Sequence, residues 1–352
     1  MQVSAKFLIF FIPIGCIIAL TAFQYAPKVS RSNLADSISF KQPSNFPVPA
    51  YDLKHNPITT KGFLLGKALF YDPSLSADGT VACGNCHQAS AAFANLGSAV
   101  SKGIKGCKGS RNAPPLFNLA WQKEYMWDGR INAMQLVPVN ALTNPCEMGN
   151  SIDKLLLNLQ KDNSYPSRFK EVFGSSKITQ QMVLDALSQF TAMLISANSK
   201  YDRYMRHEAG ASFTLNEEAG YEFFKQKCAS CHTEPLFTDL SYRNNGLEET
   251  SIDIGRDSLT HQRSDNGKFR VPTLRNIEIT GPYMHDGRFY SLKEVLQHYN
   301  AGMKKHANLD KVFTQNQQPG IAISATEQTQ IIAFLKTLTD VDFINDRRFN
   351  NH

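Results

Sequence analysis

The chain of 352 residues is long enough to form two domains with ordinary hydrophobic cores. Its composition is that of a globular protein, with 42% hydrophobic and 19% charged residues. The formal net charge of +6 is small for this length and is spread along the chain. This charge is too weak to indicate a nucleic-acid-binding protein, and at most it favours docking of an acidic redox partner.

The N-terminal segment predicts export. Residues 7–23 carry no charge and follow Lys6, a pattern typical of a signal peptide or of a short anchor that is not cleaved. We therefore expect residues 1–23 to be a signal peptide or a membrane anchor, with any membrane contact confined to this segment. Residues 24–50, which contain four prolines, are expected to form an extended linker.

The motif C-x-x-C-H occurs twice in the chain. The two copies are Cys83-Gly-Asn-Cys86-His87 and Cys228-Ala-Ser-Cys231-His232. Two thiols at this spacing reach the two vinyl groups of one porphyrin as thioethers, and the histidine that follows is placed to bind the iron. A zinc site or a redox C-x-x-C is the alternative, but neither copy has a second Cys or His pair nearby at zinc-finger spacing. The sequence therefore predicts two covalent c-type haems.

Hydrophobic periodicity along the chain predicts mainly helices. The expected helices cover residues 60–71, 183–198, 214–228 and 324–338. The last two begin with the capping boxes Thr214-Leu-Asn-Glu217 and Ser324-Ala-Thr-Glu327. Strand alternation is nearly absent, and residues 89–115 have the composition of a long loop. We therefore predict an all-α protein with long loops.

The two halves of the chain repeat the same blocks in the same order. After each haem motif come an Arg-Asn pair and then a block that contains Asp-Gly-Arg. These blocks are Arg111-Asn112 and Trp127-Asp-Gly-Arg130 in the first half, and Arg275-Asn276 and His285-Asp-Gly-Arg288 in the second. The order predicts two tandem cytochrome c-like domains, residues 51–200 and 201–352, each built around one haem.

The second half carries a candidate for the iron ligand opposite the histidine. A helix predicted after Arg288 places Tyr299 on the apolar face that looks inward. A tyrosinate oxygen is a known haem ligand, so Tyr299 is a candidate to bind the second iron across from His232. A buried core tyrosine is the alternative reading of this pattern, and His298 and Met303 are rival ligands.

The first half lacks such a ligand. The residue fourteen positions after Trp127 is Ala141, just as Tyr299 lies fourteen positions after His285, and alanine cannot bind iron. No histidine occurs in residues 88–206. We therefore expect an open first haem and a closed second haem, and this asymmetry favours an enzyme over a non-catalytic di-haem electron carrier.

Two further residues are candidates for the chemistry at an open haem. Cleavage of an O–O bond needs a group near the iron that transfers a proton, and Glu147 lies in the segment expected to cover the first haem. A solvated surface glutamate is the alternative. Trp127, opposite His285 in the repeat, is expected near the domain interface, where its ring could relay an electron, although core packing is the default role of a tryptophan. Cys107 and Cys146 are expected to form a disulfide between the lysine-rich loop and the Glu147 segment.

The ordered blocks resemble those of the bacterial di-haem cytochrome c peroxidases and of the related methylamine-utilisation di-haem enzyme, which matures a tryptophan-derived quinone in a partner protein. The matching blocks are Leu65-Gly-Lys-Ala-Leu-Phe70, both haem motifs, Arg111-Asn112, Trp127-Asp-Gly-Arg130, Glu147-Met148, Val271-Pro-Thr-Leu-Arg-Asn276 and Pro282-Tyr-Met-His-Asp-Gly287. The resemblance implies that His87 and His232 are proximal ligands, with the first haem peroxidatic and the second electron-transferring. It implies that Trp127 lies between the haems and that Glu147 is the acid–base residue.

The resemblance also implies a calcium ion between the domains. Its ligands would be the side chain of Asn112 and the carbonyl oxygens of Thr280 and Pro282, an oxygen set that suits calcium.

The chain departs from typical peroxidases in two places. These proteins have methionine where this chain has Tyr299, and they carry a histidine in the loop before Arg111-Asn112 that this chain lacks. We therefore expect that no reductive activation is needed. The predicted function is periplasmic reduction of hydrogen peroxide to water, with electrons from a small cytochrome c or cupredoxin. One alternative is an oxidase of the methylamine-utilisation type that modifies aromatic residues of a substrate protein, and the other is the electron carrier.

Overall fold

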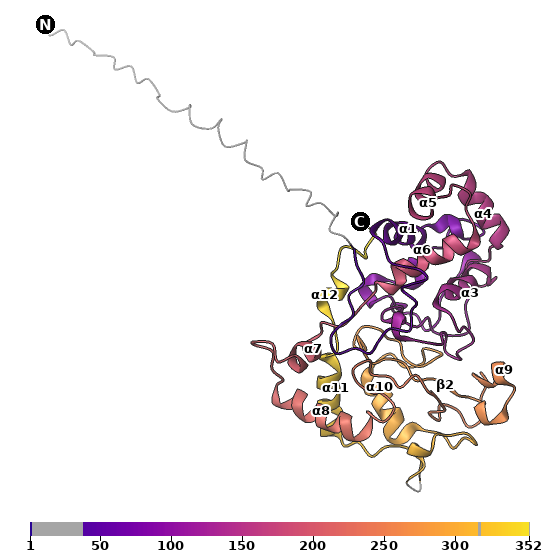
Figure 1. Cartoon of the computed structure of the whole chain (residues 1–352). Coiled ribbons are helices and arrows are strands. Elements are labelled where there is room, and N and C mark those ends of the chain that lie inside the picture. The colour runs from indigo at the N-terminus through magenta and orange to yellow at the C-terminus, as the bar shows by residue number, and fades with distance from the viewer. Residues whose placement is uncertain (2–37, 316–317, 352) are drawn as a thin grey trace. The chain divides into compact units, whose positions relative to one another are not determined.

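The computed structural model describes Met1 and residues 38–315 and 318–351 (Figure 1). The expected signal peptide or anchor and residues 24–37 of the expected linker lie outside the described residues. Residues 38–50 contain no helix or strand, but Phe46 is buried and packs edge-on against Trp121 at 4.9 Å. Among the described residues, no helix is long and apolar enough to cross a membrane.

The chain is mostly helical, as the sequence predicts. In the first half the helices are α1 (Thr60–Phe70), α2 (Cys83–Cys86), α3 (Val137–Thr143), α4 (Ile152–Lys161), α5 (Tyr165–Phe173), α6 (Gln180–Ala192) and α7 (Lys200–Met205). In the second half they are α8 (Leu215–Lys227), α9 (Asp257–Thr260), α10 (Leu292–Gln297), α11 (Ala325–Lys336) and α12 (Val341–Ile344). The described part has one small sheet, in which β1 (Tyr242–Arg243) pairs antiparallel with β2 (Phe269–Arg270).

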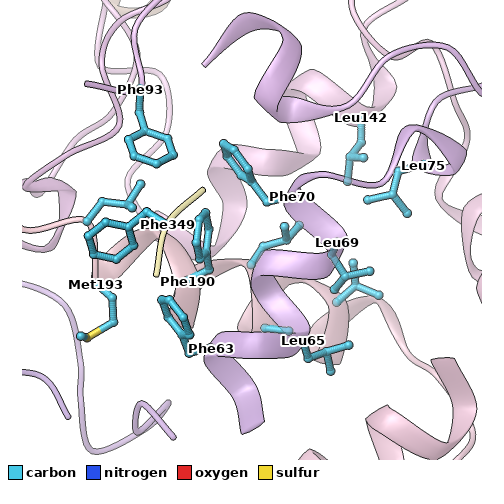
Figure 2. Packing of buried hydrophobic residues seen from close by; sticks show 14 of the residues in the cluster. Phe63, Leu65, Leu69, Phe70, Leu75, Phe93, Leu142, Phe190, Met193 and Phe349 are labelled. Carbon is cyan, nitrogen blue, oxygen red and sulfur yellow. The ribbon is translucent and has the colours of Figure 1, made fainter. Parts of the chain in front are cut away.

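The first core forms where α1 crosses α6. Two glycines of α1 allow the close approach, since a Cβ on Gly66 would lie 1.9 Å from the carbonyl oxygen of Ala186. Apolar side chains of both helices fill the space beside this crossing, as Figure 2 shows. Phe349, near the C-terminus, joins the same core, and its carbonyl oxygen accepts a hydrogen bond from the Tyr71 hydroxyl. The segment after α11 therefore returns to the core of the first half.

The second core lies between α8 and α11. Both helices begin at the predicted capping boxes, in which the Thr214 and Ser324 side chains accept from the backbone N–H groups of Glu217 and Glu327. Gly220 permits close packing of the helices, because a Cβ there would lie 1.9 Å from the carbonyl oxygen of Gln330. This packing fixes the C-terminal end of α8, which is where the second haem motif begins.

One helix prediction was wrong at both ends. The expected helix 183–198 is α6, which begins at Gln180 because Thr179 caps it, and ends at Ala192. The chain leaves the helix there because Asn118 binds the next segment. The Asn118 N–H donates to the carbonyl oxygen of Leu194, and its side chain accepts from the N–H of Ser196.

The repeat is visible in two equivalent loops, although one sequence pairing was wrong. Each loop has a left-handed methionine, Met126 at φ 68° and Met284 at φ 73°, before the Asp-Gly-Arg block. The counterpart of Asn276 is Asn118 and not Asn112. Both are left-handed, at φ 55° and 56°, and each precedes its block by the same nine residues. The two Arg-Asn pairs are not equivalent positions of the repeat, because the number of residues between each pair and its Asp-Gly-Arg block differs.

Candidate functional site

The first haem motif borders a cavity of about 690 Å³. Cys83 and Cys86 are the first and last residues of α2, and His87 follows them as its C-cap. The Nδ1 atom of His87 lies 2.9 Å from the carbonyl oxygen of Phe93. Only a protonated nitrogen can donate to a carbonyl, so the Nε2 atom carries the lone pair that a metal needs. Burial lowers the pKa of His87 to about 4, which keeps the ring neutral.

The second motif borders a narrower cavity of about 190 Å³. Cys228 ends α8, and the Nδ1 atom of His232 lies 3.2 Å from the carbonyl oxygen of Phe237. This bond again leaves Nε2 unprotonated, and burial lowers the pKa of His232. The second histidine therefore has the same hydrogen-bonded Nδ1 atom and the same available Nε2 atom as the first.

The cysteines of the two motifs do not have the character of zinc ligands. Burial raises the pKa of the Cys83 and Cys228 thiols to about 12, and a structural zinc ion would need four N or S ligands at the metal. Among the described residues, no three His, Cys, Asp or Glu side chains converge as a metal-binding group. Neutral, cavity-facing thiols next to a neutral histidine fit covalent attachment of a haem better than they fit zinc.

The two cavities differ in their lining at equivalent positions of the repeat. Tyr299 lines the second cavity, and Ala141 lines the first. Tyr299 is carried by a wider π turn, His298–Gly302, that continues α10. Neither rival ligand lines the cavity: His298 bonds the carbonyl oxygen of Asn245 at 2.9 Å, and Met303 is buried elsewhere.

Met284 is a cavity-lining residue that the sequence reasoning missed. Its thioether lines the second cavity and accepts a hydrogen bond from the Asn245 side chain at 3.3 Å. Its counterpart Met126 lines the first cavity. The signal was present in the sequence, because each methionine directly precedes the repeated block.

Glu147 lines the first cavity, together with two asparagines. The Asn144 side chain donates to the Oε1 atom of Glu147 at 2.8 Å, and that of Asn140 lies at 3.5 Å. Burial raises the pKa of Glu147, and the hydrogen bond from Asn144 lowers it by less. The side chain is therefore a carboxyl group that holds its proton more readily than a surface glutamate.

Trp127 lines both cavities. Its indole N–H donates to the carbonyl oxygen of Asn112 at 2.8 Å, and its own carbonyl oxygen accepts from the N–H of Arg270 at 2.8 Å. One hydrogen bond thus fixes the indole ring and the other fixes the backbone of the same residue. Its place between two domains stays a prediction.

The residues expected to bind calcium lie together at the second cavity. Asn112, Thr280 and Pro282 all line it. The Asn112 side-chain nitrogen donates to the carbonyl oxygen of Ala99 at 3.0 Å, which leaves its Oδ1 atom as the free ligand atom. Calcium binding by these residues stays a prediction.

Arg270 is a second residue that sequence reasoning missed. It is 8% exposed and lines both cavities, and its Nε atom donates to the carbonyl oxygen of Met126 at 3.3 Å. Within residues 38–315 and 318–351, no carboxylate forms an ion pair with it. Burying a guanidinium without an anion is costly. The carboxylates of a haem would supply that anion, so the polar groups of the cavities fit this cofactor.

The disulfide predicted between Cys107 and Cys146 is confirmed. It joins the loop of residues 101–109 to the segment that carries Glu147. The N–H of Ile104 also donates to the carbonyl oxygen of Glu147 at 2.8 Å. The loop therefore forms one wall of the first cavity, where Ser101 and Gly103 line it.

The fold and these two cavities define a helical protein with paired C-x-x-C-H sites that share one tryptophan. Residues 60–210 match the family model described as di-haem cytochrome c peroxidase. The chain is 35% identical over 308 residues to methylamine utilization protein MauG of Methylorubrum extorquens, covering 85% of this chain and 83% of that protein. It is 32% identical over 283 residues to cytochrome c551 peroxidase of Nitrosomonas europaea, covering 78% of this chain and 79% of that protein.

A solved structure shares the fold as well. A MauG-like protein associated with microbial copper homeostasis matches 89% of this chain and 99% of its own chain, with a TM-score of 0.79 and 30% identity. The chain belongs to the di-haem cytochrome c peroxidase family. It is accordingly an enzyme of the oxidoreductase class, in a family whose members carry two haems.

Proposed function

We propose that the protein is a di-haem c-type peroxidase, which reduces hydrogen peroxide to water with electrons from a small cytochrome c or cupredoxin. Cys83 and Cys86 would attach the first haem and Cys228 and Cys231 the second, within two tandem cytochrome c-like domains. When bound, the haem irons supply the redox chemistry that amino-acid side chains lack. The observation that carries the proposal is the difference between the two cavities. Glu147 and Ala141 line the first cavity, whereas Tyr299 lines the second.

The residues at the first cavity suit peroxide chemistry. The neutral His87 ring offers Nε2 as an iron ligand, and the small Ala141 side chain offers no competing ligand at the position of Tyr299. Burial raises the pKa of Glu147, so this carboxyl group binds a proton more readily than a surface glutamate, and it would move a proton between the two oxygen atoms of the peroxide. Asn140 and Asn144 orient the carboxyl group for that transfer.

The second site suits electron storage. His232 and Tyr299 would hold its iron from both sides, which leaves no position for peroxide. Trp127 borders both cavities and would carry electrons between them. Asn112, Thr280 and Pro282 would bind a calcium ion beside this path and hold the two halves together. Export to the periplasm through residues 1–23 belongs to the same proposal, because the donor proteins named above are found there.

A second candidate function is modification of aromatic residues in a partner protein. It is favoured by the 35% identity to MauG and by Tyr299, because the resemblance implies that the quinone-maturing enzyme has a tyrosine at this position whereas typical peroxidases have a methionine. The two functions differ in how fast small donors are used. Steady-state oxidation of reduced cytochrome c should be rapid and peroxide-dependent in a peroxidase, without prior reduction of the enzyme. Sluggish turnover, with a peroxide-oxidised state that persists, would support the partner-modifying function instead.

A further inference from the structure

The Cys107–Cys146 disulfide lies one residue away from Glu147. Cys107 belongs to the loop of residues 101–109, and the two cysteines are 39 positions apart in sequence. Both cysteines are half-buried and lie outside the fully buried core. The disulfide is therefore the covalent link between an exposed loop and the backbone that carries the acid–base carboxyl group.

The loop has few other attachments to the body of the protein. Its backbone hydrogen bonds are internal, for example from the N–H of Gly103 to Cys107 and from that of Gly109 to Ser101. The exception is the bond from the N–H of Ile104 to the carbonyl oxygen of Glu147, at 2.8 Å. Without the disulfide, the backbone of the loop would be tied to the Glu147 segment by this single hydrogen bond.

The loop and the Glu147 backbone are packed with no space between them. A Cβ on Gly103 would lie 2.2 Å from the carbonyl oxygen of Cys146 and 2.5 Å from the Cα atom of Glu147. Real side-chain atoms do not approach backbone this closely, so the position accepts only glycine. Any movement of the loop is consequently transmitted to the backbone of Glu147.

We infer that the Cys107–Cys146 disulfide is a positioning element for the peroxide reaction. It holds the loop of residues 101–109 against the Glu147 backbone and thereby keeps the carboxyl group at the first cavity. This inference rests on the proposed role of Glu147. Reduction of the bond lowers the rate of peroxide turnover without removing any group that touches peroxide. The proposed class of regulator is a thiol reductant that acts at the rim of the active site.

The test is a double-mutant cycle on the haem-loaded enzyme. In Cys107→Ser/Cys146→Ser, we expect peroxide turnover to fall roughly 10- to 100-fold, the loss that a small misplacement of a catalytic group produces. The same pair of substitutions in a Glu147→Gln background should cause no further loss, since the group being positioned is already gone. Equal losses in both backgrounds would overturn the inference, as would full activity of the serine double variant.

A second readout is independent of turnover. Hydrogen exchange at the amide of Ile104 should accelerate when the disulfide is reduced in the wild-type holoenzyme, and exchange in α6 should not change. Unchanged exchange at Ile104 would contradict the inference. Should the serine variant fail to fold, Gly103→Ala keeps the disulfide but displaces the same backbone, and Lys108→Ala, at an exposed side chain of the same loop, is its control. We expect Gly103→Ala to lower turnover and Lys108→Ala to leave it unchanged; equal turnover in the two variants would contradict the inference.

The outcomes separate this inference from the proposed function. If Glu147→Gln alone leaves turnover unchanged, the proposed role of Glu147 is wrong and the disulfide has nothing to position. If Glu147→Gln abolishes turnover while reduction of the disulfide has no effect, only the inference about the disulfide is wrong.

Discussion

At the residue scale, Glu147 is the side chain on which the proposed peroxide chemistry depends. A positioned acid–base group contributes about 10²- to 10⁴-fold to the rate. Glu147→Gln keeps the shape and the hydrogen bond from Asn144 but cannot transfer the proton. We therefore expect peroxide turnover to fall by about that factor while both haems remain bound. The check is steady-state kinetics combined with haem quantification.

The same substitution has a predictable effect on stability. Burial raises the pKa of Glu147 in the folded state, so the fold favours the protonated carboxyl. The contribution of this group to stability is complete below the usual pKa of glutamate and is lost as pH rises through the raised pKa. Glu147→Gln stays neutral throughout. Its melting temperature should therefore exceed that of the wild type above this pH range and match it in acid.

The control for this pH dependence is Glu171→Gln. Glu171 pairs with Lys61 on the surface, and its side chain is 60% exposed. A surface pair of this kind contributes little to stability. A pH-dependent difference of the same size in both variants would mean that burial of Glu147 is not its cause.

Arg270 permits a test of how the cofactors are held. Its guanidinium is buried at both cavities without a carboxylate partner in the described part of the chain. A nearby positive charge destabilises the oxidised, more positive iron. We therefore expect Arg270→Met to lower the midpoint potentials of both haems, as measured by spectroelectrochemistry. The exposed Arg348→Met should leave both unchanged, and unchanged potentials in Arg270→Met would contradict the assignment.

At the element scale, close packing of α1 on α6 supports the wall behind the first motif. A Cβ on Gly66 would overlap the backbone of Ala186, which cannot rotate away. Forcing an extra carbon into a packed core costs about 1–3 kcal/mol. Gly66→Ala should lower the unfolding free energy by this amount in denaturant titrations. Gly109→Ala, where the nearest atom would lie 3.7 Å away, should not.

Local signals predicted the helices whose ends are set locally, and tertiary contacts decided the rest. The capping boxes at Thr214 and Ser324 located α8 and α11 because the caps are made within four residues. The end of α6 was misplaced, because Asn118, far away in sequence, takes the backbone groups after Ala192. Helices α4 and α5 were not anticipated, and neither was the β1–β2 pair.

The candidate site could be predicted to the extent that its residues belong to repeated or contiguous motifs. The haem motifs, Trp127 and Tyr299 were found in this way. Arg270 could not be found, because nothing local distinguishes a buried arginine that faces two cavities from a surface arginine. Aligning the repeat correctly, with Asn118 paired to Asn276, would have drawn attention to the segment that contains Arg270.

At the scale of the whole molecule, the two cavities share one wall. Asn112, Pro115, Trp127 and Arg270 line both of them. A substitution in this wall should therefore affect both haems, whereas a change at Ala141 or Tyr299 affects one. This division of roles follows from a repeated architecture in which one copy has Tyr299 where the other has Ala141.

The central claim is that only one iron is accessible to peroxide. The most direct measurement is the electron paramagnetic resonance spectrum of the resting ferric holoenzyme. We predict one high-spin signal, from the iron held by His87 with no protein ligand opposite it, and one low-spin signal from the iron held by His232 and Tyr299. Tyr299→Phe should convert the low-spin signal to high spin, and the exposed Tyr290→Phe should not. Two low-spin signals from the wild-type enzyme would contradict the account.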